Sequence, residues 1–155
     1  MLDLGATSTV ALCANVLGAI AYRTLQFHTV INTGSIATEQ VYELLRKVRA
    51  AHRKPISMVL DNARYQKNKA VIELATKLQI ELVYLPAYSP NLNLIERVWK
   101  FVKAEALSAR VLPEFASFRH SIESTLSQMT TKHRSKMKSL ITRNFQLFDD
   151  AHLLS

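Results

Sequence analysis

The chain has 155 residues, of which 48% are hydrophobic and 21% are charged. This composition is typical of one globular domain with a real core, and it excludes an intrinsically disordered chain. Twenty lysine and arginine residues against twelve acids give a net charge of +8. That excess favours a polyanionic partner, most simply nucleic acid, although a basic surface kept for solubility is the alternative.

The one cysteine, Cys13, excludes an internal disulfide framework and favours a reducing, cytoplasmic location. It lies in an apolar run without an adjacent base, so we expect a buried thiol and not a nucleophile. Residues 4–22 carry no charge, but Asn15 and Gly18 interrupt the run. A buried strand therefore explains it better than a membrane span or a signal peptide.

The first half of the chain alternates between strand and helix patterns. Residues 10–20 predict a strand, and residues 23–30 are expected to pair with it as a hairpin across Ala21 and Tyr22. A loop at 32–35 precedes a helix whose apolar residues share one face: Val41, Leu44, Leu45 and Val48. Residues 56–60 are apolar and β-branched and end on Asp61, which predicts a buried parallel strand.

The second half continues with helix, strand and a stiff loop. Residues 68–78 predict a helix and residues 81–85 a strand. Pro86 and Pro90 make the next loop rigid, and Asn91 or Asn93 is suited to cap the long helix that follows. The stripe of this helix is Ile95, Val98, Trp99 and Val102.

The remainder of the chain is predicted to be helical. Pro113 suits a first turn, and the apolar faces are Phe115, Phe118, Ile122, Leu126 and Met129, then Met137, Leu140 and Ile141. Strands, then alternating helix and strand, then helices predict one α/β layered domain over residues 1–155 with a mixed sheet flanked by helices.

Two carboxylates are candidate site residues. Asp61 follows a predicted strand at the sheet edge where ligands bind in open α/β folds, although it could instead cap a helix or start a turn. Glu96 borders the apolar stripe of the long helix, where a glutamate by itself is usually solvated or ion-paired. The rigid Pro86–Pro90 loop favours a site, because it fixes where that helix begins and where Glu96 points.

Two segments resemble the DDE transposases, most closely the mariner-like branch that includes many bacterial insertion-sequence transposases. They are Leu60-Asp61-Asn62-Ala63-Arg64 and Leu85-Pro86-x-Tyr88-Ser89-Pro90-x-Leu92-Asn93-x-Ile95-Glu96-x-x-Trp99-x-x-x-Lys103. The 34 residues between Asp61 and Glu96 are the spacing typical of that branch. The resemblance, from about Asn15 to Phe148, implies an RNase H-like fold with Asp61 and Glu96 as the second and third catalytic acids.

The resemblance also implies two-metal phosphoryl transfer on DNA. Mg²⁺ or Mn²⁺ prefers carboxylate oxygens, and two such ions neutralise charge on the attacking and leaving oxygens. Asp61 and Glu96 are expected to hold them, with Asn62 and Arg64 as supporting residues. Many relatives have a histidine after the Asp-Asn-Ala motif, where this chain has Tyr65 and Gln66, so a proton shuttle there is not expected.

Basic residues surround both motifs. Residues 44–69 contain eight lysines or arginines and only one acid, Asp61. Lys100 and Lys103 lie on the helix face of Glu96, where they are expected to contact DNA phosphates; a solvated face is the alternative. The other DNA-binding candidates are Arg97, Lys67 and Lys69. Trp99 is expected to anchor the core, and the five histidines show no ligand-type spacing.

The first aspartate of the family pattern has no clear equivalent. Asp3 is the only acid before Asn15, and its surroundings do not resemble the first-strand motif. We therefore expect a domain lacking the first strand and catalytically incomplete alone. Alternatives are a non-catalytic decoy or repressor that binds DNA or pairs with full-length transposase, a different RNase H-like nuclease, or a remnant. Dimerisation through an exposed sheet edge is a further hypothesis.

Overall fold

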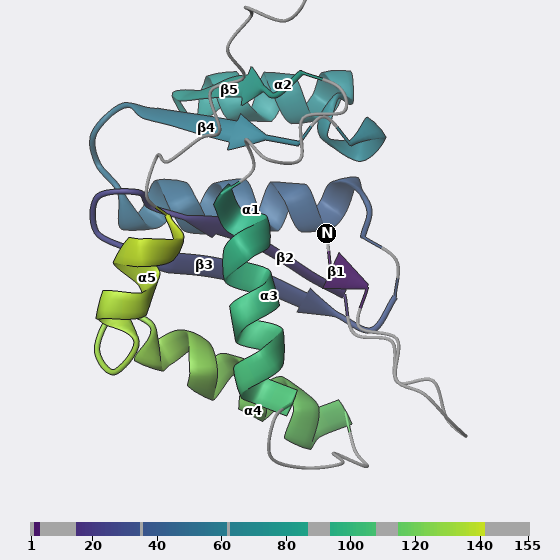
Figure 1. The fold of residues 1–155 in the computed structure, drawn as a ribbon. Coiled ribbons are helices and arrows are strands. Elements are labelled where there is room, and N and C mark those ends of the chain that lie inside the picture. The colour runs from purple at the N-terminus through teal and green to yellow at the C-terminus, as the bar shows by residue number, and fades with distance from the viewer. Residues whose placement is uncertain are drawn as a thin grey trace, which may run out of the picture.

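The computed structural model describes residues 2–3, 15–34, 36–61, 63–86, 94–107 and 115–141, with the side chains of residues 2, 3, 107 and 115 excepted. In chain order the elements are β1 (Leu2–Asp3), β2 (Asn15–Ile20), β3 (Phe27–Asn32), α1 (Thr38–Ala51), β4 (Ile56–Leu60), the 3₁₀ turn η1 (Arg64–Gln66), α2 (Lys69–Lys77), β5 (Ile80–Tyr84), α3 (Leu94–Leu107), α4 (Phe115–Gln128) and α5 (Arg134–Leu140) (Figure 1).

The strands form two sheets. β1, β2 and β3 are antiparallel, with Val16 opposite Ile31 and Leu2 opposite Val16. β4 and β5 are parallel, with Met58 opposite Leu82. Within the described residues no strand joins β2 to β4, and Figure 1 shows the two sheets on either side of α1. Both antiparallel and parallel pairing occur, as expected for a mixed sheet.

Two apolar cores cover opposite faces of β2, because successive residues of a strand point to opposite sides. Leu17 packs with the four predicted residues of α1, all buried, and with α2 and β4. Val16 packs with α3, α4 and α5, including Trp99 and Met129. We refer to these as the α1-side core and the α3-side core.

The helices agree with the periodicity of their apolar residues. In α2, Asn68 caps the helix by accepting a hydrogen bond from the Ala70 N–H at 3.0 Å, and Val71 and Ala75 are buried. In α3, Val98, Trp99 and Val102 are buried as expected. No helix in the described ranges is long and apolar enough to cross a membrane.

The predicted hairpin is present, but its turn was predicted wrongly. Residues 21–26 connect the strands, β3 begins at Phe27, and the Ala21 N–H donates to the Gln26 carbonyl at 2.9 Å. Leu25 has a left-handed backbone, with φ of 62°, and is only 3% exposed in the α3-side core. Burying its side chain gains roughly 1.5–3 kcal/mol, which offsets about 1–2 kcal/mol for that conformation.

β4 is less buried than its sequence predicted. Met58 lies in the α1-side core, but Val59 on the other face is 59% exposed and Val83 of β5 is exposed as well. Among the described elements, no helix covers this face of β4 and β5. Part of the apolar run over residues 56–60 is therefore exposed to solvent. The predictions on residues 10–14, including Cys13, and those on Asn91, Asn93 and Pro113 lie outside the described residues.

Candidate active site at the ends of the parallel strands

Asp61 comes directly after β4, at the carboxyl edge of the parallel pair. The pairing continues one residue beyond the strands, because the Leu85 N–H donates to the Leu60 carbonyl at 2.8 Å. Asp61 is exposed at this edge, beside the point where β5 leads into the loop toward α3. Parallel strands end at a common edge, so Asp61 lies where ligands of open α/β sheets bind.

The turn after Asp61 is held in place by two hydrogen bonds. The side-chain carbonyl of buried Gln66 accepts from the Ala63 N–H at 3.2 Å. The Tyr84 hydroxyl donates to the Gln66 backbone carbonyl at 2.8 Å and so ties the turn to the end of β5. Lys67 lies 5.7 Å from the centre of the Tyr84 ring. Together these contacts restrict the backbone that follows Asp61, as a preorganised ligand requires.

Two tyrosines of this region stay protonated at neutral pH. Burial raises the pKa of Tyr65, and the nearby charge of Asp61 raises it further. Burial also raises the pKa of Tyr84, which keeps its hydroxyl a donor to Gln66. A neutral phenol beside a carboxylate adds no competing negative charge, so the position remains suitable for a cation.

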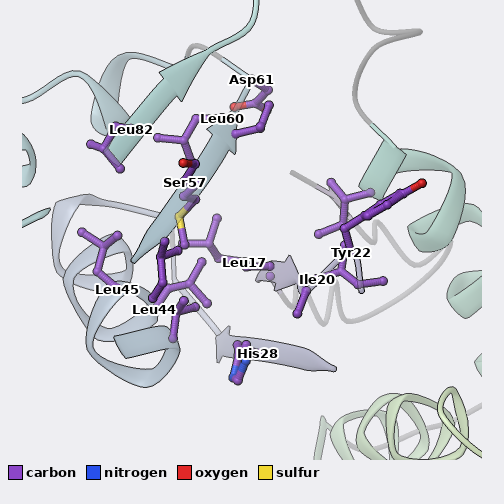
Figure 2. A pocket seen from close by; sticks show the side chains of 18 of the residues that line it. Leu17, Ile20, Tyr22, His28, Leu44, Leu45, Ser57, Leu60, Asp61 and Leu82 are labelled. Carbon is purple, nitrogen blue, oxygen red and sulfur yellow. The ribbon is translucent and has the colours of Figure 1, made fainter. Parts of the chain in front are cut away.

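A large cavity connects Asp61 to the start of α3. Its volume is about 1130 Å³, and its wall includes Asp61, Leu94, Ile95 and Trp99. Figure 2 shows Asp61 at its upper edge, beyond Leu60 and Ser57 of β4. The first turn of α3 therefore borders the same cavity as Asp61, although 32 residues, 62–93, separate Asp61 from Leu94.

Glu96 is half-buried in that first turn of α3. An acid there also stabilises the helix through its dipole, so the position alone does not require a ligand role. Ile95, its neighbour, lines the cavity wall, whereas Glu96 itself is outside the wall. The fold thus brings the segment carrying Glu96 to the cavity that Asp61 borders. Asn62, the supporting candidate beside Asp61, lies outside the described residues.

The basic candidates occupy two regions. Arg64, Lys67 and Lys69 are exposed in and after the turn that follows Asp61, and Lys69 lies 3.9 Å from Glu73. On α3, Lys100 is exposed, whereas Arg97 and Lys103 are half-buried. An exposed ion pair at that distance leaves Lys69 available to other anions.

The donor chemistry fits a hard divalent cation, because the candidates are carboxylates and Mg²⁺ prefers oxygen ligands. The set is incomplete in the described part of the chain, where no three His, Cys, Asp or Glu side chains are grouped closely enough to hold a metal. Asp61 at the cavity and Glu96 beside it therefore need further oxygen ligands to bind two ions.

Residues 9–119 match the family model of the DDE superfamily endonucleases. This match spans most of the chain and contains both Asp61 and Glu96. The chain belongs to the DDE superfamily endonucleases. A comparison with curated proteins found no match.

Two solved structures share the fold of this DDE domain. One is a chain of the simian T-cell lymphotropic virus intasome in complex with PP2A regulatory subunit B56 gamma, with a TM-score of 0.63 and 14% identity over 76% of this chain. The other is the catalytic core domain of BIV integrase, with a TM-score of 0.58 and 12% identity over 76% of this chain and 75% of that one. The DDE domain spans 42% of the intasome chain. These likenesses confirm the RNase H-like α/β fold.

The sequence did not predict two features of this DDE domain. Gln66 and Tyr84 are 18 residues apart and meet only because β4 and β5 pair. The only local indication of a role for Gln66 is its position three residues after Ala63, whose N–H its side chain accepts from. His28 and His52 were expected to be ordinary, yet their Nε2 atoms lie 3.0 Å apart. One ring is on β3 and the other ends α1, so no spacing in the sequence indicates the contact.

Proposed function

We propose that this domain is the catalytic core of a DNA transposase of the mariner-like, bacterial insertion-sequence branch. The observation that carries the proposal is the family match over residues 9–119, which includes both carboxylate motifs. The cavity adds support, since Asp61 and the first turn of α3 border it together. The reaction class is phosphoryl transfer on DNA, as in DNA transposition and recombination.

Asp61 and Glu96 are the residues we assign to metal binding. Bound Mg²⁺ or Mn²⁺ would supply charge neutralisation at the phosphate and at the attacking and leaving oxygens. In the first step, water attacks phosphorus and a P–O bond breaks to free a 3′-hydroxyl at the transposon end. That hydroxyl then attacks a target phosphodiester, forms a new P–O bond and displaces the 3′-oxygen of the target strand.

We assign two roles to the other residues of the site: holding the turn that follows Asp61, and binding DNA phosphates. Arg64 lies next to the Asp61 turn, and the Gln66–Tyr84 hydrogen bond fixes that turn. Lys100 and Lys103 are four and seven residues after Glu96, so their charges extend along its face of α3 toward DNA phosphates. We place the working protein in the cytoplasm, associated with the nucleoid when it is bound to transposon-end and target DNA.

We further propose that the 155-residue chain does not cleave DNA alone. Its two assigned carboxylates are one fewer than the family pattern, and the described residues contain no third acid near Asp61 that completes a metal group. Mg²⁺- or Mn²⁺-dependent nicking of transposon-end DNA by the purified chain, abolished by Asp61→Ala, would overturn this part of the proposal.

Metal binding tests the assignment without requiring turnover. We expect weak Mn²⁺ binding by the chain, measured by electron paramagnetic resonance, and a loss of roughly tenfold in affinity in Asp61→Asn and in Glu96→Gln. Glu73→Gln is the matched control, because Glu73 is exposed on α2 and its partner is Lys69. Equal Mn²⁺ affinity in all four proteins would show that Asp61 and Glu96 are not the ligands.

A non-catalytic role is the second candidate, and the net charge of +8 favours it. A basic domain with an incomplete acid set could bind transposon ends, or pair with full-length transposase, and so act as a decoy or repressor. Inhibition of an intact transposase by both the chain and its Asp61→Asn variant would support this role. Loss of inhibition in Asp61→Asn would count against it.

A further inference from the structure

Two histidine rings, His28 of β3 and His52 directly after α1, are in contact. Their Nε2 atoms lie 3.0 Å apart, and their ring centres are 5.2 Å apart with 82° between the ring planes. Both residues are only partly buried, so an ion can reach them from solvent. A hydrogen bond between the rings would give this separation, and so would two nitrogens directed at one metal ion.

The backbone fixes the two histidines from separate elements. His28, labelled in Figure 2, pairs with Ala19 of β2 and shares a strand face with Val30, which is buried in the α1-side core. His52 is the C-cap of α1, and its carbonyl accepts a hydrogen bond from the Arg49 guanidinium. Two ligands that are already held close together need little rearrangement to bind an ion, which is the preorganisation that a metal site requires.

The distance between the two nitrogens indicates the class of metal. Imidazole nitrogens bind transition metals at about 2.0–2.1 Å, so two nitrogens 3.0 Å apart subtend roughly 91–97° at the ion. That angle is close to the ~90° of square-planar and octahedral coordination, which suits Ni²⁺ and Cu²⁺, and smaller than the ~109° of tetrahedral Zn²⁺. Mg²⁺ prefers oxygen ligands, so this pair differs in chemistry from the proposed catalytic acids.

The charges around the two rings act in opposite directions. His52 lies at the C-terminus of α1, where the helix dipole favours a cation. The charge of Lys47 acts on His28 and opposes a cation. However, the Lys47 ammonium is engaged elsewhere, because it lies 2.8 Å from the Glu43 carboxylate and donates to the Thr29 carbonyl at 3.0 Å. Removing the charge of Lys47 should therefore strengthen the binding of a metal ion between the rings.

We propose that His28 and His52 form a two-histidine site for a divalent transition-metal ion of the Ni²⁺ and Cu²⁺ class, which links β3 to the end of α1. Water completes its coordination, since the described residues contain no group of three His, Cys, Asp or Glu side chains that could hold a metal. Without the ion, one ring donates its Nε2–H to the other. When the ion binds, that proton moves to Nδ1 of the same ring, and both Nε2 lone pairs face the metal. The site does not depend on the proposed phosphoryl transfer.

Calorimetric titration of the full chain with Ni²⁺ at about pH 7.5, where imidazole is neutral, measures the site. We expect one ion per chain, with affinity reduced roughly tenfold or more in His28→Gln and in His52→Gln. His120→Gln is the matched control, because its ring is exposed on α4, and it should keep full affinity. Asp61→Asn should also keep full affinity, which separates this site from the proposed catalytic acids. Lys47→Gln should bind Ni²⁺ more tightly.

A second measurement uses the unmodified chain and so does not depend on the folding of any variant. With one equivalent of Cu²⁺, the electron paramagnetic resonance spectrum should show hyperfine splitting from two imidazole nitrogens. Splitting from fewer than two nitrogens would overturn the proposal and leave the rings sharing a hydrogen bond alone. Equal Ni²⁺ affinity in His28→Gln, His52→Gln and the unmodified chain would also overturn it. If Asp61→Asn alone lost Ni²⁺, the ion would belong to the proposed catalytic acids and not to the histidines.

Discussion

Gly18 of β2 lies against the Trp99 ring of α3, and a Cβ added there would collide with that ring. We expect Gly18→Ala to lower the free energy of unfolding by about 1–3 kcal/mol, because the added methyl group must displace the rigid, buried Trp99 ring. Gly34→Ala is the matched control, since a Cβ there meets Asn32 at an ordinary 3.6 Å. Urea denaturation of both variants measures the difference. Equal stability of the two variants would contradict the close approach of Trp99.

Tyr84 acts on the site through the turn that follows Asp61. Tyr84→Phe removes the hydroxyl that donates to the Gln66 carbonyl, and we expect a loss of about 0.5–1.5 kcal/mol in stability. Amide exchange at residues 63–67 should become faster than in Tyr42→Phe, the control, whose ring packs on the α1-side core. Identical exchange in these two variants would show that the hydrogen bond does not hold the turn.

His28 makes stability depend on pH. Burial lowers its pKa below 6.5, and the charges of His52 and Lys47 lower it further. As pH falls below 6.5, the unfolded chain takes up a proton that the folded chain refuses, so the free energy of unfolding decreases. We expect this decrease to shrink in His28→Gln and to persist in His120→Gln, where the ring is exposed. Denaturation between about pH 5 and 7.5 measures it, and an unchanged slope in His28→Gln would refute the assignment.

At the scale of elements, α3 carries two of the basic residues that we propose contact DNA. Lys100 and Lys103 follow Glu96 on one face, and we expect Lys100→Ala/Lys103→Ala to weaken binding to any DNA sequence. The slope of log affinity against log salt should fall by about 2, since each phosphate contact contributes about 0.9. The control is Lys136→Ala/Lys138→Ala, an exposed pair on α5. A loss of the same size in the control pair would show that the effect is net charge and not this face.

The helices could be predicted from sequence because their cores depend on local periodicity. Val41, Leu44, Leu45 and Val48 repeat at helical spacing and are all buried in α1. The turn at 21–26 could not, because Leu25 adopts a left-handed backbone only to reach a core made by distant helices. The assignment of Asp61 and Glu96 to a site rests on motifs and spacing and stays a prediction. The Gln66–Tyr84 bond and the His28–His52 contact required tertiary pairing, which a single sequence does not display.

At the scale of the whole molecule, α1 is what connects the two sheets in the described chain. Its buried residues belong to the same core as Leu17 and Val30 of the antiparallel sheet and Met58 and Ile80 of the parallel pair. The α3-side core, which includes Met129, contains no residue of β4 or β5. A cavity in the α1-side core should therefore loosen the parallel pair selectively.

Leu45→Ala and Met129→Ala test this division, since both side chains are almost completely buried and each truncation is expected to cost about 2–5 kcal/mol. In Leu45→Ala we expect amide exchange to accelerate most in β4, β5 and α2, because these elements lose their packing against α1. In Met129→Ala the acceleration should be greatest in α4 and α5, with β4 and β5 changed least. If both variants instead accelerate exchange uniformly, the molecule opens as one cooperative unit. The parallel pair would then not open independently of the antiparallel sheet.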